Sequence, residues 1–152
     1  MAKLLGIKVV DLSLFLPGPM LSMMMADQGA EVVKVEPPTG DPAREMEPME
    51  AGQSVWFRNL NGHKQCITLD LKAAKGKDIL KRLAKDADVL LENYAPGVMD
   101  RLGVGWSVLH ELNPRLVYAS GSGYGITGPD KDNLAMDVTV QAVSGLMSVS
   151  ST

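Results

Sequence analysis

The chain has 152 residues, of which 45% are hydrophobic, and this is enough to build one buried core. Its 15 Lys and Arg against 18 Asp and Glu give a formal net charge of −3, with no long run of one sign. Bulk electrostatic attraction to nucleic acid or to an anionic membrane is therefore not expected. Cys66 is the single cysteine and two histidines offer no zinc-like spacing, so we expect no disulfide, no metal and a reducing, cytoplasmic compartment.

The N-terminal segment resembles a secretory signal peptide only in its apolar content. Lys8 and Asp11 interrupt the apolar run before it is long enough to serve as the hydrophobic region of such a signal. Pro17, Pro19 and Asp27 break up the richest apolar stretch, so no segment reaches the roughly 20 residues that a membrane-spanning helix needs. We therefore expect mature structure from the start of the chain and a soluble protein that does not enter a membrane.

Strand and helix patterns alternate along the chain. Short, nearly continuous apolar runs rich in β-branched residues are typical of strands covered on both faces, and apolar residues three or four apart are typical of helices. These patterns predict strands at residues 6–12, 31–36, 65–71, 88–93 and 115–120, and helices at residues 20–29, 72–87, 97–103, 106–113 and 135–147. Residues 37–53 and the glycine-rich residues 121–133 are predicted to be loops.

This alternation predicts a single α/β domain over residues 1–152. A strand, a helix and a second strand within about thirty residues form the right-handed crossover that joins parallel strands. We therefore expect a mostly parallel sheet with helices on both faces. A helix that closes a crossover is followed by another strand. No strand pattern follows residues 135–147, so the chain is expected to be the incomplete N-terminal part of a larger fold.

Glu36 ends the second predicted strand, where a dinucleotide-binding fold places the acid that holds a ribose hydroxyl. The turn after the first strand, however, contains a single glycine, Gly18, between two prolines, and not the pattern G-x-G-x-x-G. Because proline has no N–H group, this turn offers few backbone donors to a pyrophosphate. The sequence therefore argues against NAD or FAD.

Two features leave alternatives open. Gly121, Gly123 and Gly125 follow the last predicted strand, and they either let the backbone approach a ligand or form a flexible connection. No Gly-Lys-Ser/Thr follows them, so they do not form a Walker loop. Asp137 lies in an apolar stretch and is either a helix N-cap or an acid directed at the ligand-binding edge of the sheet.

Several other reactive or polarisable residues are given structural interpretations. The methionines of residues 20–25 have helical spacing and are predicted to fill the core. Cys66 lies on a predicted strand and is expected to be a small buried residue, not a nucleophile. His63 and His110 have no nucleophile motif beside them, so both are predicted to be structural or solvated.

Six blocks follow one another with regular spacing: GIKVVDLS…PGP, ADQGAEVVKVEPPTGD, NLNGHKQCITLDLK, ADVLLENYAPGVMDRLGVGW, LNPRLVYASGSGYG and MDVTVQAVSGLM. Together they resemble the family III CoA-transferases, the CaiB/BaiF family, from about Gly6 to the end of the chain. The resemblance implies a Rossmann-like N-terminal domain that binds coenzyme A (CoA). It also implies that the family's complete chain is longer and that two ring-shaped subunits interlock into a homodimer.

The resemblance places residues from four parts of the chain beside CoA. They are Phe15, Leu16 and Pro17 in the first turn, Leu69, Asp70, Leu71 and Lys72 after the third strand, Asn93 and Tyr94 after the fourth, and Arg101 with Leu102. Lys72 and Arg101 would supply cationic donors to phosphates, while Tyr94 and Leu102 would supply apolar faces to the adenine. Without the resemblance, the two cations would be interpreted as ordinary surface charges.

The resemblance also implies a covalent mechanism, in which an aspartate attacks acyl-CoA and then carries CoA to a carboxylic acid acceptor. The family's nucleophile lies in a motif beyond Thr152, and Asp137 matches a supporting active-site acid. Leu16 and Pro37 replace a glutamine and an arginine of formyl-CoA transferases, so the acyl group is not predicted. Met136 takes the place of the catalytic histidine of α-methylacyl-CoA racemases and has no proton to move.

These features predict the CoA-binding N-terminal part of an acyl-CoA:carboxylate CoA-transferase, catalytic only with the rest of the family's chain. A non-catalytic CoA-binding or assembly module is the alternative, and an acyl-CoA racemase is disfavoured by Met136. The expected substrates are an acyl-CoA and a carboxylic acid, with no metal and no nucleic acid partner. Part of a larger fold is also expected to expose apolar surface where the remainder packs.

Overall fold

A parallel sheet forms the centre of the molecule. The computed structural model describes residues 2–150 and places five strands in the order β5-β2-β1-β6-β7. The strands are β1 (Lys8–Asp11), β2 (Glu31–Glu36), β5 (Gln65–Thr68), β6 (Val89–Glu92) and β7 (Val117–Ser120), and every neighbouring pair is parallel. The predicted α/β fold is therefore confirmed, and each strand lies within its predicted range.

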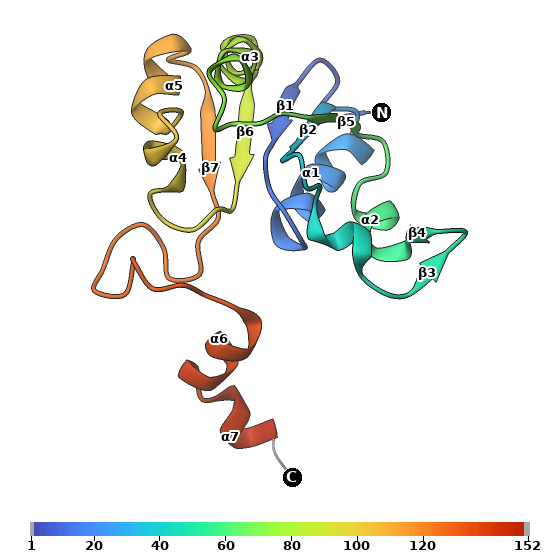
Figure 1. Cartoon of the computed structure of the whole chain (residues 1–152), viewed down its shortest axis with the longest axis vertical. Coiled ribbons are helices and arrows are strands. Elements are labelled where there is room, and N and C mark those ends of the chain that lie inside the picture. Colours follow the sequence, from blue (N-terminus) through green and yellow to red (C-terminus); the bar gives the residue numbers. More distant parts are fainter. Residues whose placement is uncertain (1, 151–152) are drawn as a thin grey trace.

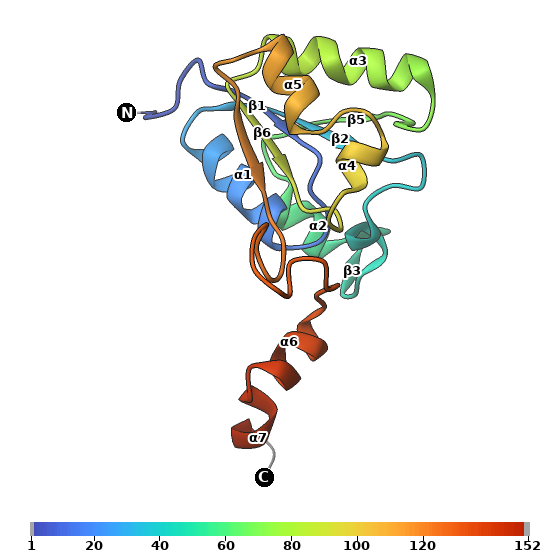
Figure 2. The ribbon, with the colours of Figure 1, turned by 90° about the vertical axis from the view of Figure 1, so that its left-hand side faces the viewer.

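Helices cover both faces of this sheet. They are α1 (Pro17–Asp27), α3 (Ala74–Lys85), α4 (Val98–Arg101) and α5 (Trp106–Leu112). Figure 2 shows α1 on one side of the sheet and α3, α4 and α5 on the other. The two prolines at the start of α1 suit a first helical turn, where an N–H group would have no partner. Gly29, with a φ of 96°, follows the end of this helix.

Alternating side chains of the central strands divide the core into two clusters. The cluster on the side of α3 and α5 contains Val10, Leu12, Val35, Leu80, Leu90 and Leu109. The cluster on the side of α1 contains Val9, Ala26, Val32 and Leu91. Because successive side chains of a strand point to opposite faces, strands buried on both sides have nearly continuous apolar runs. This is the pattern from which the strands were predicted.

Charged side chains are also buried on the α1 side of the sheet. The Lys64 Nζ lies 3.2 Å from Asp11 Oδ2, and both side chains are 0% exposed. Lys64 also donates hydrogen bonds to the Pro19 carbonyl and to Asn61 Oδ1, each at 2.8 Å. Burial lowers the pKa of Lys64, and the Asp11 carboxylate opposes this effect. The pair thereby joins the end of β1 and the start of α1 to the segment before β5.

Residues 37–60 contain more regular structure than their sequence predicts. The predicted loop holds a short 3-10 helix η1 (Pro42–Glu45) and the hairpin strands β3 (Met49–Glu50) and β4 (Gln53–Ser54), and α2 (Val55–Leu60) follows it. Ser54 caps α2, because its Oγ accepts a hydrogen bond from the Phe57 N–H at 3.3 Å. These elements are too short to show a hydrophobic period.

The single helix predicted at residues 135–147 is wrong. Two short helices, α6 (Asp137–Val143) and α7 (Leu146–Ser150), take its place. Gly145 separates them with a φ of 79°, a left-handed conformation that ends a helix. Figure 1 shows both helices projecting away from the sheet. In residues 2–150, no helix has the length and apolar character needed to cross a lipid bilayer.

Two predictions of burial are wrong in part or in full. Met25 packs against the α1-side cluster as predicted, but Met20 and Met24 are 47% and 48% exposed, because α1 faces the sheet with Ser22 and Ala26. Cys66 is an exposed free thiol. It lies on β5, which pairs with β2 alone at one end of the sheet. The hydrophobic periodicity predicted the helix and the strand, but it did not show which of their side chains face solvent.

The buried pair can be tested by removing its cation. We expect Lys64→Ala to lower the free energy of unfolding by about 3–5 kcal/mol, because Asp11 would stay buried without its partner. The matched control is Arg58→Ala, which breaks a pair with Glu50 whose side chains are 49% and 64% exposed. That variant should lose less than about 1 kcal/mol. Urea unfolding followed by tryptophan fluorescence measures both, and equal losses would contradict the assigned role.

Candidate functional site

The strand order reverses at the centre of the sheet, and this point defines the candidate site. β1 and β6 are neighbours there, with β2 on the outer side of β1 and β7 on the outer side of β6. In open parallel sheets, ligands bind outside the carboxyl ends of the strands at such a point. The turn at residues 13–17 and residues 93–94 follow these two strands. Both segments contain residues predicted to contact CoA.

The turn after β1 is held by a side chain that follows β6. The Asn93 amide accepts a hydrogen bond from the Leu14 N–H and donates one to the Leu14 carbonyl, each at 2.8 Å. Phe15 has a φ of 64°, a left-handed conformation that few residues other than glycine adopt. Phe15 and Leu16 are 49% and 46% exposed, and Pro17 is exposed as well. The turn therefore presents apolar side chains from an anchored backbone.

Two buried charged residues hold the same turn from the side of β2. Asp41 Oδ1 accepts a hydrogen bond from the Phe15 N–H at 3.2 Å. Asp41 Oδ2 lies 3.0 Å from Lys34 Nζ, and both side chains are 0% exposed. Lys34 donates a hydrogen bond to the Ser13 carbonyl at 2.7 Å. The sequence signal for this pair was a lysine inside the apolar strand EVVKVE, because a buried charge needs a partner.

Glu36, at the end of β2, is committed to the loop that carries Asp41. Its carboxylate accepts two hydrogen bonds from Arg44, both at 2.7 Å, and one from the Asp41 N–H at 3.0 Å. Burial alone would raise the pKa of Glu36, but these hydrogen bonds and the charge of Arg44 hold it below its ordinary value. Arg44 also lies 3.8 Å over the ring of Phe57. Glu36 thus has a structural partner in the place where a ribose hydroxyl was considered.

The remaining predicted CoA residues divide into an apolar group and an exposed group. Leu69, Leu71, Tyr94 and Leu102 belong to the α3-side core cluster or pack against it. Asp70, Lys72 and Arg101 are exposed, and Asp70 Oδ1 accepts a hydrogen bond from the Lys72 N–H at 2.9 Å. Lys72 follows Leu71 and Arg101 precedes Leu102, so each exposed cation is next in sequence to a residue of this apolar cluster.

Tyr94 packs against this cluster and lies just after the end of β6. Its N–H donates a hydrogen bond to Glu92 Oε2 at 2.9 Å. Burial raises the pKa of Tyr94 to about 12, and the negative charge of Glu92 adds to the effect. The tyrosine therefore presents a neutral, half-buried ring at neutral pH.

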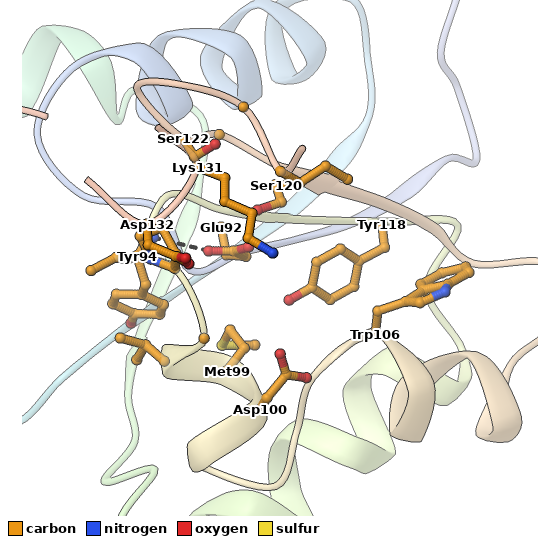
Figure 3. Close-up of a pocket in the computed structure, with 17 residues that line it drawn as sticks. Glu92, Tyr94, Met99, Asp100, Trp106, Tyr118, Ser120, Ser122, Lys131 and Asp132 are labelled. Atoms are coloured by element: carbon orange, nitrogen blue, oxygen red, sulfur yellow. Dashed lines mark hydrogen bonds between the residues drawn. The ribbon is translucent and has the colours of Figure 1, made fainter. Parts of the chain in front are cut away.

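A cavity of about 860 Å³ opens beside Tyr94, at the carboxyl ends of β6 and β7. Figure 3 shows Glu92, Tyr118 and Trp106 around it, with Lys131 and Asp132 entering from the glycine-rich loop. Its lining residues are Glu92, Tyr94, Ala95, Pro96, Gly97, Val98, Met99, Asp100, Trp106, Tyr118, Ser120, Gly121, Ser122, Gly125, Ile126, Lys131 and Asp132. Of the residues predicted to contact CoA, Tyr94 is the one that lines this cavity.

The cavity combines aromatic faces with acidic groups. The rings of Trp106 and Tyr118 meet edge to face with centroids 5.8 Å apart. Burial raises the pKa of Tyr118, and the charges of Glu92 and Asp100 add to this effect. Within residues 2–150, no group of three or more His, Cys, Asp and Glu side chains is arranged to hold a metal ion.

Asp137 lies apart from this edge of the sheet. It is exposed on α6, which projects away from the body of the molecule (Figure 1). Its Oδ2 accepts a hydrogen bond from Gln141 Nε2 at 2.6 Å. Met136 is the N-cap of α6, so the interpretation of Asp137 as the N-cap is wrong. Asp137 occupies the first turn instead, where the helix dipole still favours a negative charge.

The segment that carries Asp137 exposes much apolar surface. Met136, Val138, Val143, Leu146 and Val149 are each more than half exposed. No residue of α6 or α7 is buried. The expected exposure of apolar surface is therefore found, and it is concentrated at this end of the described chain.

The chain is similar in sequence to known CoA-transferases. The profile of a family described as CoA-transferase family III matches residues 4–152. Acetyl-CoA:oxalate CoA-transferase of Acetobacter aceti is 45% identical over 143 residues, which cover 93% of this chain and 37% of the relative. Succinyl-CoA–D-citramalate CoA-transferase of Chloroflexus aurantiacus is 40% identical, over 94% of this chain and 36% of its own length.

A solved structure has a similar fold. The crystal structure of a CaiB/BaiF family protein from Brucella suis matches with a TM-score of 0.89 and 36% identity, over 96% of this chain and 40% of that chain. The chain thus spans between 36% and 37% of the length of the two curated relatives described above.

The buried environment of Tyr94 predicts that its phenol ionises only at strongly alkaline pH. We expect Tyr94 to ionise near pH 12, because burial and Glu92 favour its neutral form. A phenol whose pKa is raised on folding contributes stability that is complete below about pH 10 and is lost as the pH rises through the folded-state value. Absorbance at 295 nm will measure this, and Tyr94→Phe should lack the step near pH 12. Ionisation of Tyr94 near pH 10 in the folded protein would contradict the prediction.

Proposed function

The chain belongs to CoA-transferase family III, and we propose that residues 1–152 form the CoA-binding, Rossmann-like N-terminal domain of an acyl-CoA:carboxylate CoA-transferase. The observation that supports this proposal is that residues 15–17, 69–72 and 93–94 follow the carboxyl ends of β1, β5 and β6, while Leu102 packs against the same cluster as Leu69 and Tyr94. These positions come from four separate parts of the chain.

Each part of this edge matches a part of CoA. The half-buried Tyr94 and Leu102 offer apolar faces to the adenine. Lys72 and Arg101 are exposed and extend their charges toward solvent, where they can donate charge-assisted hydrogen bonds to phosphates. The exposed Phe15 and Leu16 on the first turn would contact the less polar part of the ligand.

We further propose the family's covalent exchange for the complete enzyme. An aspartate carboxylate beyond Thr152 attacks the acyl-CoA carbonyl, and CoA leaves as a thiolate while a mixed anhydride forms. The thiolate then attacks the aspartyl carbonyl, which releases the donor carboxylate and leaves an aspartyl-CoA thioester. The acceptor carboxylate attacks this thioester and expels the thiolate, which attacks the acceptor's acyl carbon and regenerates the aspartate. Each step exchanges one acyl bond for another, so the aspartate divides a difficult exchange into easier ones.

Asp137 is proposed as a supporting acid in this exchange, acting on the acceptor or on the intermediate. This role requires α6 to meet the CoA edge in the complete protein, which we propose to be an interlocked homodimer located in the cytoplasm. The apolar surface of α6 and α7 supports such an assembly, because exposed apolar patches mark surfaces that pack against other protein. Met136 precedes Asp137 and cannot transfer a proton, which argues against racemisation.

CoA recognition can be tested at the two exposed cations. We expect Lys72→Ala and Arg101→Ala each to raise the CoA dissociation constant about five- to tenfold, because each removes a donor for phosphate. The matched control is Arg115→Ala, an exposed arginine before β7 at the opposite edge of the sheet, which should leave the constant unchanged. Calorimetric titration with CoA in low salt measures all three. Equal weakening by Arg115→Ala would indicate nonspecific attraction and contradict the proposed site.

The proposal that catalysis involves residues beyond Thr152 predicts a large native protein. We expect the intact mass of the protein purified from its source to exceed twice the 16.3 kDa of this sequence. Transfer of CoA from an acyl-CoA to a carboxylic acid should then be measurable with that protein. A mass of 16.3 kDa, together with CoA binding and no turnover, would instead support the alternative of a non-catalytic CoA-binding or assembly module.

A further inference from the structure

The backbone of the turn at residues 13–17 is held by hydrogen bonds to side chains from other parts of the chain. The Asn93 side chain has one amide oxygen and one amide nitrogen, and each makes a 2.8 Å hydrogen bond to the backbone of Leu14. Asn93 is 79 positions away from Leu14 in sequence, so these hydrogen bonds link the segment after β1 to the segment after β6. Asn93 therefore uses its amide on the turn, and not as a free group directed at a ligand.

Asp41 and Lys34 supply the second anchor of the turn. Asp41 accepts a hydrogen bond from the Phe15 N–H at 3.2 Å, and its carboxylate lies 3.0 Å from Lys34 Nζ. Lys34 in turn donates a hydrogen bond to the Ser13 carbonyl at 2.7 Å. Asp41 itself is fixed by Glu36, which accepts its N–H at 3.0 Å. The backbone on both sides of Leu14 is thus held by Lys34 of β2 and by Asp41 in the loop after it, while Leu14 is held by Asn93, which follows β6.

These hydrogen bonds hold Phe15 in a strained backbone conformation. Its φ of 64° is unfavourable for a residue with a Cβ atom, and such conformations persist only where the surroundings impose them. A turn that is ordered before the ligand arrives avoids the entropy loss of ordering on binding. The exposed Phe15 and Leu16 are therefore presented in one fixed arrangement.

We infer that Asn93 and Asp41 are positioning residues for CoA binding, acting through the turn at residues 13–17. This inference rests on the proposed function. It changes the role of Asn93 from a direct CoA contact to an anchor of Phe15 and Leu16. It also assigns a role to Asp41, which lies outside every segment predicted from the sequence to contact CoA. Neither residue is expected to touch a reacting atom.

The test compares two variants with a matched control in the full-length protein. Asn93→Ala removes both hydrogen bonds to Leu14, and Asp41→Asn removes the charge that faces Lys34. The control is Asn113→Ala, because the Asn113 amide donates to two backbone carbonyls at 3.0 and 2.8 Å far from the turn. Hydrogen exchange of the peptide covering residues 12–20, the CoA dissociation constant and the melting temperature are measured for each.

We expect Asn93→Ala to speed exchange in residues 12–20 and to raise the CoA dissociation constant about tenfold, which corresponds to about 1.4 kcal/mol. In turnover assays, KM for acyl-CoA should rise while KM for the acceptor acid stays constant. Asn113→Ala should lower the melting temperature by a similar amount without either effect. If Asp41→Asn folds, it should show the same faster exchange and weaker CoA binding as Asn93→Ala. If Asp41→Asn does not fold, Asn93→Ala alone decides the test.

Two outcomes would overturn the inference, and they are distinguishable. If the wild type binds CoA and Asn93→Ala binds it equally well, the turn is not positioned by this residue. If the wild type binds no CoA, the proposed function fails and the inference fails with it. Faster exchange together with weaker CoA binding, both absent from Asn113→Ala, supports the positioning role.

Discussion

Two buried ion pairs determine how the carboxyl edge of the sheet is built. Asp11 with Lys64 and Lys34 with Asp41 lie with side chains 0% exposed. A charge removed from water is tolerated only when it is paired and its remaining hydrogen-bonding groups are satisfied. The segments that carry these charges, from β1, β2, the following loop and the chain before β5, are therefore held in one arrangement. Loss of one partner would leave the other as an uncompensated buried charge.

This arrangement separates structural charge from charge that can meet a ligand. The buried carboxylates and lysines already have partners, whereas Lys72 and Arg101 are exposed next to residues of the apolar cluster, where we propose that they meet phosphates. The backbone of the turn at residues 13–17 is fixed by hydrogen bonds to buried side chains, whereas Phe15, Leu16 and Pro17 are exposed. A rigid, partly apolar edge with peripheral cations follows from this division.

The sequence predicted the parallel sheet because strands buried on both faces leave long apolar runs, which are easy to recognise. It did not predict α2 or the β3–β4 hairpin, because these segments are too short to show a hydrophobic period. The grouping of Leu69, Tyr94 and Leu102 was predicted only through the family resemblance, because hydrophobic patterns do not specify ligands. Asp41 was missed for a related reason: Lys34 inside an apolar strand indicates a buried charge, but only the fold shows that its partner is Asp41, 7 positions later in sequence.

The apolar surface of α6 and α7 bears on how Asp137 can act. Both helices lie outside the two core clusters, and Val138, Val143 and Val149 are more than half exposed. Covering such side chains is favourable by about 25 cal/mol for each Å² removed from water, so protein packed against them would fix the orientation of α6. Asp137 begins this helix, and its direction is set by the same contacts. The edge proposed to bind CoA is therefore organised within the described residues, whereas we expect the position of the proposed supporting acid to depend on the protein surface that covers α6 and α7.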